Sequence, residues 1–93
     1  MLYKHEYGVE LEILVGKIGK NKHLMREFLF DLLSPAEYKD LAVRWQIIKL
    51  LKGGITHREI AKKLKVSVAT VTRGSRELAN KKGGFQSVFK KFY

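Results

Sequence analysis

The apolar residues of this 93-residue chain recur every three or four positions over most of its length. That spacing places side chains on one face of an α-helix, and the segments 9–18, 22–33 and 85–92 each show such a face. No segment alternates apolar and polar residues with the period of two that is typical of a strand. Together with three helices between residues 35 and 81, the pattern predicts an all-α fold of about six helices.

Capping residues mark where the central helix begins. Ser34, Pro35 and Glu37 form a start signal, because serine caps a helix, proline suits its first position and glutamate returns the capping hydrogen bond. The helix that follows runs to about Lys52, before a pair of glycines. Its apolar residues lie on most of its sides, which predicts a central, well-buried helix.

Residues 57–76 have the proportions of a helix-turn-helix. Thr56 and Glu59 form a second capping box at the start of the first helix. Ser67 caps a further helix, which runs to about Lys81. We therefore expect the motif to span residues 56–81, approximately.

The two helices of this motif need a close crossing and a tight turn. Val71 is predicted to pack against Ala61, whose small side chain lets the helices approach each other. The turn position is Lys65, where glycine is usual in such motifs. Lysine then has to adopt the left-handed backbone conformation, at a cost of roughly 1 kcal/mol.

Positive charge is concentrated in the same part of the chain. The net charge is +10, and residues 56–82 carry eight Lys or Arg against two Glu. A solvated basic surface is one interpretation, but a nucleic-acid partner better explains so local an excess. A helix-turn-helix places its second helix in the major groove of double-stranded DNA. The side chains expected to contact DNA are Arg58, Lys62, Val68, Ala69, Thr70, Thr72 and Arg73.

Two other interpretations stay open from these residues alone. The pair could be a helical hairpin without a role in DNA binding, or a basic module that binds an acidic protein partner. An enzyme is not expected, since the chain has no nucleophile motif, no phosphate-binding glycine loop and no cysteine. The histidines His5, His23 and His57 are scattered, so no metal site is predicted.

Composition also bounds where the chain is expected to act. The absence of cysteine excludes disulfides and favours a reducing compartment. No apolar run approaches the roughly 18 residues of a membrane span. Glu6 and Glu10 interrupt any apolar stretch that could serve as a signal peptide. We therefore expect a cytoplasmic protein.

About half of the chain resembles the tryptophan repressor family: LLSPAEYKDLAVRWQIIKLLKGGITHREIAKKLKVSVATVTRGSREL, with the family's signature ATVTRGS. The resemblance implies that residues 1–93 form a single domain, in an intertwined homodimer with six helices per chain. It also implies a transcriptional repressor that uses free L-tryptophan as corepressor and has no enzyme cofactor. The loaded dimer would bind a palindromic operator and control genes of tryptophan biosynthesis or uptake.

The resemblance assigns ligand-binding roles position by position. Arg44 and Arg73 would hold the indole ring between them, and Arg73 would also bind the carboxylate, because a planar guanidinium suits both tasks. Ile48 would line the floor of the pocket. Ser34 would meet the ligand's amino group from the other subunit.

Two further positions in the second helix of the motif belong to this implied site. A glycine inside a helix costs roughly 0.5–1 kcal/mol, and the resemblance explains Gly74 as a gap that gives the ligand access to the backbone. Alanine at Gly74 would then stabilise the helix and weaken tryptophan binding. Glu77 stands where well-known members carry a serine, and it would either hold the ligand's ammonium group or pair with Arg73.

One departure from the family pattern keeps an alternative function open. The turn GGITHREI is one residue shorter than in the best-known members, and it lies between the implied pocket and the DNA-contacting helix. The alternative is a Trp-repressor-like DNA-binding regulator that does not respond to tryptophan.

Overall fold

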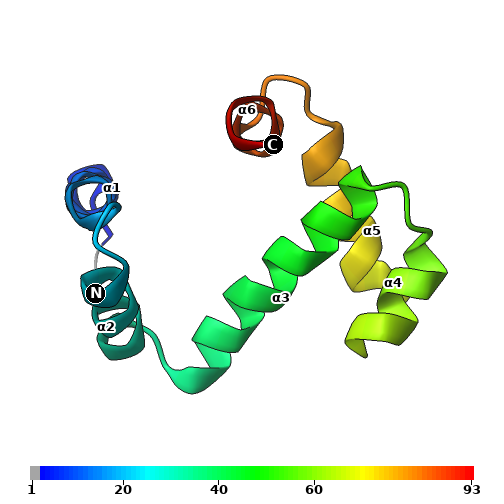
Figure 1. Cartoon of the computed structure of the whole chain (residues 1–93), viewed down its shortest axis with the longest axis horizontal. Coiled ribbons are helices and arrows are strands. Elements are labelled where there is room, and N and C mark those ends of the chain that lie inside the picture. Colours follow the sequence, from blue (N-terminus) through cyan, green and yellow to red (C-terminus); the bar gives the residue numbers. More distant parts are fainter. Residues whose placement is uncertain (1–2) are drawn as a thin grey trace. The chain divides into compact units, whose positions relative to one another are not determined.

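The computed structural model describes residues 3–93, and all regular elements in that range are α-helices (Figure 1). They are α1 (His5–Ile18), α2 (Lys22–Leu32), α3 (Pro35–Lys52), α4 (His57–Leu64), α5 (Val68–Ala79) and α6 (Gly84–Phe92). The predicted all-α fold with six helices is confirmed. Met1 and Leu2, which belong to the predicted domain 1–93, lie outside the described residues.

Two helix ends differ from the prediction by two residues or more. α1 begins at His5, before the predicted segment 9–18, although Lys4 provides no side-chain cap. α5 ends at Ala79 rather than near Lys81, because Asn80 adopts an extended backbone conformation. Neither end has a side chain that caps it, so the apolar pattern alone could not locate it to the residue.

The chain divides into two compact units, one ending at Tyr38 and one running from Lys39 to Tyr93. In the first unit, no described residue of α1 or α2 is buried. Its large apolar side chains stay open to solvent: Ile13, Phe30 and Leu32 are 55%, 49% and 50% exposed. Apolar helix faces of this kind need a further surface to cover them.

The start of α3 is held by the predicted capping box. The backbone N–H of Ser34 donates to Glu37 Oε1 over 2.9 Å, and the N–H of Glu37 donates to Ser34 Oγ over 3.2 Å. Hydrogen bonds from Ser34, first from its backbone and then from its side chain, lower the pKa of the Glu37 carboxyl. The ionised form of Glu37 is therefore the one that the folded state favours.

We expect acid to remove this stabilisation. Because the folded-state pKa of Glu37 is lowered, its carboxylate stabilises the helix start above the ordinary pKa of a glutamate and loses that effect as the pH falls through the lowered value. The melting temperature of the wild type should exceed that of Glu37→Gln at neutral pH, and the difference should shrink and then close as the pH falls below the ordinary pKa of a glutamate. Thermal unfolding followed by circular dichroism measures this, and a difference that does not change with pH would contradict it.

The second unit has its core around the helix-turn-helix. Ile47 of α3, Ile60 and Ala61 of α4, and Val71 of α5 are buried in one cluster. Ala61 and Val71 thus belong to the same core, as the predicted close crossing of α4 and α5 requires. Burial of each large aliphatic side chain in this cluster contributes about 1.5–3 kcal/mol, so the cluster fixes the two helices of the motif against α3.

The turn between α4 and α5 has the geometry that the sequence predicts. Lys65 adopts the left-handed conformation, with φ 57° and ψ 45°. The N–H of Val66 donates to the carbonyl of Ala61 over 3.1 Å. Ser67 Oγ then accepts a hydrogen bond from the N–H of Thr70 over 3.1 Å and caps α5. α4 and α5 therefore form a helix-turn-helix.

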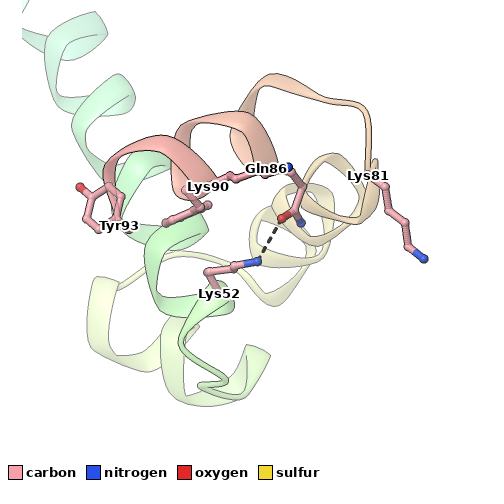
Figure 2. Close-up of a pocket in the computed structure, with 6 residues that line it drawn as sticks. Lys52, Lys81, Gln86, Lys90 and Tyr93 are labelled. Carbon is pink, nitrogen blue, oxygen red and sulfur yellow. Dashed lines mark hydrogen bonds between the residues drawn. The ribbon is translucent and has the colours of Figure 1, made fainter.

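The C-terminal helix α6 is tied to α3 and α5 by aromatic packing and one amide. Phe89 is buried, and its ring stacks on Trp45 of α3 with the centroids 5.3 Å apart. Gln86 Nε2 donates to the carbonyl of Leu78 in α5 over 2.7 Å. Gln86 Oε1 accepts from Lys52 Nζ at the end of α3 over 3.0 Å (Figure 2). These contacts hold α6 against the two helices that carry the candidate site.

Candidate functional site

A cavity of about 730 Å³ lies in the second unit, lined by α3, the helix-turn-helix and the start of α6. Its apolar lining comes from Val43, Ile47, Ile48, Leu64, Val66 and Phe85. Cavities of this volume bind small organic molecules. Because α5 forms part of the wall, a molecule bound here would touch the second helix of the motif.

Charged side chains lie around this apolar lining. Arg44 of α3 and Arg73 of α5 are exposed, and Glu77 follows Arg73 by one turn of α5. Within residues 3–93, none of these three side chains forms an ion pair. The pairing of Glu77 with Arg73, one of the two predicted alternatives, is therefore not formed. All three charges are available to a bound molecule.

Gly74 lies at a close contact between α5 and α3. A methyl group added at Gly74 would come within 3.0 Å of Ile47 Cγ2 and 3.3 Å of Ile48 Cδ1. The space that a side chain at Gly74 would occupy is therefore filled by Ile47 and Ile48 of α3 and is not an open gap, while the access of a ligand to the backbone of Gly74 stays a prediction. The glycine lets the two helices approach, and in this way it shapes the cavity that it also lines.

This contact reverses one expected mutational effect. We expect Gly74→Ala to destabilise the protein by about 1 kcal/mol, because displacing two isoleucine side chains outweighs the gain in helix propensity. Urea denaturation measures the change. Arg76→Ala, at an exposed position of the same helix, is the control and should change the stability by less than about 0.5 kcal/mol. If Gly74→Ala is more stable than the wild type, the gain in helix propensity outweighs the contact with α3, as the sequence alone predicted.

The first turn of α5 presents several of the predicted DNA contacts to solvent. Val68, Ala69 and Thr70 are exposed there, and Arg58 and Lys62 are exposed on α4. Small apolar side chains suit thymine methyl groups, and cations suit phosphates. The motif therefore combines a surface for base edges with flanking positive charge.

Thr72 differs from the exposed position that was expected. Its side chain is half-buried, and its Oγ1 lies 3.4 Å from Nδ1 of His57 at the start of α4. The hydroxyl therefore joins the two helices of the motif and is less available to DNA. No local pattern predicts this contact, because the two residues are 15 positions apart along the chain.

Nine of the residues that line the cavity were not assigned to ligand binding from the sequence, and two of them are informative. Lys65 and Phe85 both line the cavity. For Lys65, the sequence does contain an indication of a special role: a lysine occupies a turn position where glycine is usual. Phe85 had no local signal, because its place depends on how α6 packs against α3. Ser34, which the sequence did assign, lies in the first unit as the cap of α3, and its role across a dimer stays a prediction.

Comparison with known proteins decides the family. The family model described as Trp repressor protein matches residues 10–92. The chain belongs to the Trp repressor family. A Trp operon repressor homolog of Chlamydia trachomatis serovar D is 47% identical over 81 residues, covering 85% of this chain and 80% of that protein. The Trp operon repressor homolog of Vibrio campbellii is 38% identical over 72 residues, covering 76% and 70%. No solved structure matches the chain significantly.

Membership in the Trp repressor family establishes the general function. The chain is a DNA-binding transcriptional regulator. The Trp repressor family consists of repressors and is not a family of enzymes. Its helix-turn-helix, at α4 and α5, coincides with the most basic part of the chain. In the described part of this Trp-repressor-family protein, no three His, Asp or Glu side chains gather as metal ligands, and none of the helices has the length and apolar character needed to cross a membrane.

Proposed function

We propose that this Trp-repressor-family protein is activated by L-tryptophan, binds a palindromic operator as a homodimer, and represses genes of tryptophan biosynthesis or uptake. The supporting observation is the cavity beside α5. Arg44 and Arg73 border its apolar lining, and neither has an ion-pair partner in the chain from residue 3 onward. An aromatic amino acid combines an apolar ring with a carboxylate and an ammonium group, which is the combination that this lining matches.

Each chemical group of tryptophan has a matching side chain at the cavity. The guanidinium groups of Arg44 and Arg73 would stack on the two faces of the indole, each contact contributing about 0.5–2 kcal/mol. Arg73 would also bind the carboxylate, while Glu77 would face the ammonium group. Ile48, which is completely buried, would support the ring, and Gly74 would bring the α5 backbone close to the ligand.

The homodimer is part of the proposal because the first unit leaves its apolar surface uncovered. No described residue of α1 or α2 is buried, and a second copy of the chain would cover these helices. The single domain proposed for residues 1–93 would then be complete only in the dimer, with Ser34 supplied to the ligand across the interface. Sedimentation should show twice the mass of the chain, and a monomer at every concentration would contradict the dimer.

For DNA, α5 would enter the major groove. Val68 and Ala69 would contact thymine methyl groups, and Thr70 would reach bases or phosphates. Arg58 and Lys62 on α4 would bind the phosphate backbone. Three of the predicted contacts have a second role: Thr70 Oγ1 lies 2.8 Å from Ser67 Oγ, Thr72 Oγ1 lies 3.4 Å from His57 Nδ1, and Arg73 would be shared with the ligand.

Tryptophan would act by shifting a population of dimer conformations. A ligand between α3 and α5 would set the distance between the two recognition helices of the dimer. That distance has to match roughly 34 Å, one turn of DNA. A preference of about 1–3 kcal/mol for the matching conformation corresponds to a 5–150-fold change in operator affinity.

Selection of operators from random DNA tests this proposal. Duplexes selected in excess L-tryptophan should be enriched in inverted repeats, and removal of tryptophan should weaken binding to them by about 5–150-fold. Equal affinity with and without tryptophan would exclude tryptophan activation and favour the alternative of a regulator that does not respond to it. Failure to enrich any sequence would contradict specific DNA recognition.

A further inference from the structure

Lys65 occupies a backbone conformation that lysine disfavours. It is the only non-glycine residue with a positive φ among the described residues. Its backbone N–H caps α4 by donating to the carbonyl of Ala61, a bond that glycine would make equally well. The turn therefore does not require a lysine side chain. A residue kept in a strained conformation without a structural need points to a function of its side chain.

Lys65 lies beside the cavity of the candidate site. Lys65 lines the cavity together with Arg44 and Arg73, although it lies in the turn and not on a helix. Across the part of the chain that the structure describes, Lys65 has no ion-pair partner. Lys65 thus borders the cavity with a positive charge that no carboxylate of the described residues neutralises.

The balance of charge around the cavity favours a ligand that carries a carboxylate. Four cations line it, namely Lys39, Arg44, Lys65 and Arg73, against two carboxylates, Asp40 and Glu77. A molecule with an anionic group reduces this excess. A wholly apolar ligand would leave this excess of two positive charges around the cavity without a counter-charge.

We propose that Lys65 binds the carboxylate of the amino-acid ligand together with Arg73. This inference rests on the proposed function, since it takes the cavity to be the tryptophan site. Lys65 directly precedes Val66 and the cap of α5, so the bound carboxylate contacts the turn of the helix-turn-helix itself. Ligand occupancy is then sensed by the turn that orients α5, and not only by α3.

Four variants of the full-length protein test this role. Lys65→Gly and Lys65→Asn remove the charge but accept the left-handed conformation, whereas Lys65→Arg keeps the charge. Lys63→Gln is the matched control, because it removes one exposed positive charge of α4 that does not line the cavity. Calorimetry with L-tryptophan and with tryptamine, which lacks the carboxylate, measures binding, and thermal unfolding measures stability.

The expected results have opposite signs for stability and for binding. Lys65→Gly should raise the melting temperature by roughly 4 °C, because the backbone strain is released. It should weaken L-tryptophan binding by about 5–10-fold and leave tryptamine binding unchanged, since only the carboxylate contact is lost. Lys65→Asn should lose the same affinity, whereas Lys65→Arg and Lys63→Gln should bind L-tryptophan as the wild type does.

Several results would overturn the inference. Unchanged L-tryptophan affinity in Lys65→Gly and Lys65→Asn overturns it while leaving the proposed function intact. If operator affinity falls in those variants instead, the lysine contacts a DNA phosphate and not the ligand. Equal losses for L-tryptophan and tryptamine overturn the assignment to the carboxylate. If the wild type itself binds no L-tryptophan, the proposed function fails first and this inference fails with it.

Discussion

Replacing Arg73 with alanine is expected to weaken L-tryptophan binding by at least about 30-fold. The loss combines a charge-assisted hydrogen bond to the carboxylate, about 1.5–3 kcal/mol, with stacking on the indole, about 0.5–2 kcal/mol. The lower values together give about 2 kcal/mol, which corresponds to roughly 30-fold in affinity. The fold should survive, because Arg73 is exposed, has no ion-pair partner among residues 3–93, and is replaced by a better helix former.

A second arginine of α5 provides the control for this experiment. Arg76→Ala removes the same charge from the same helix at an exposed position that does not line the cavity. Calorimetry should show wild-type tryptophan affinity for Arg76→Ala, and circular dichroism should show unchanged helix content for both variants. Equal weakening in both variants would mean that net charge governs the binding, and it would remove Arg73 from the ligand site.

The largest loss of stability is expected for Ile60→Ala, about 2–5 kcal/mol in the free energy of unfolding. Ile60 is 0% exposed and packs in the cluster that joins α4 to α3 and α5. Alanine removes most of the side chain and leaves a cavity that Ile47 and Val71 cannot fill, because each is held by its own helix. A small domain has only about 5–15 kcal/mol of stability, so DNA binding should fall together with the fold at elevated temperature.

Urea denaturation compares this variant with the same substitution at a more exposed site. Ile55→Ala makes the identical chemical change just before α4, where the side chain is 37% exposed. It should lower the free energy of unfolding by less than about 1 kcal/mol. Similar losses at both positions would contradict the assignment of Ile60 to the core of the helix-turn-helix.

The starts of the central helices were predictable because capping is a local interaction. Ser34, Thr56 and Ser67 each accept a hydrogen bond from the backbone N–H three residues later. Both partners of such a bond stand within one helical turn of each other, so the sequence contains the whole interaction. The start of α1 at His5 has no such cap, and it was missed.

The candidate site was predictable only through the resemblance to a family. That resemblance named Arg44, Ile48, Arg73, Gly74 and Glu77, and the structure brings all of them to one cavity. Their binding roles stay proposals. No periodicity or charge pattern of the chain could have joined these positions, because they lie on two helices separated by the first helix of the motif and its turns.

By itself, the sequence determined the helical fold, most helix boundaries, the left-handed turn at Lys65 and the concentration of positive charge on the helix-turn-helix. Each of these depends on residues within one or two turns of each other. Only the tertiary structure decided that Ile47 and Ile48 fill the space beside Gly74, and that Thr72 contacts His57. These contacts depend on how closely the helices cross and on which side chains meet at the crossing. Both are set by packing between segments that are distant along the chain.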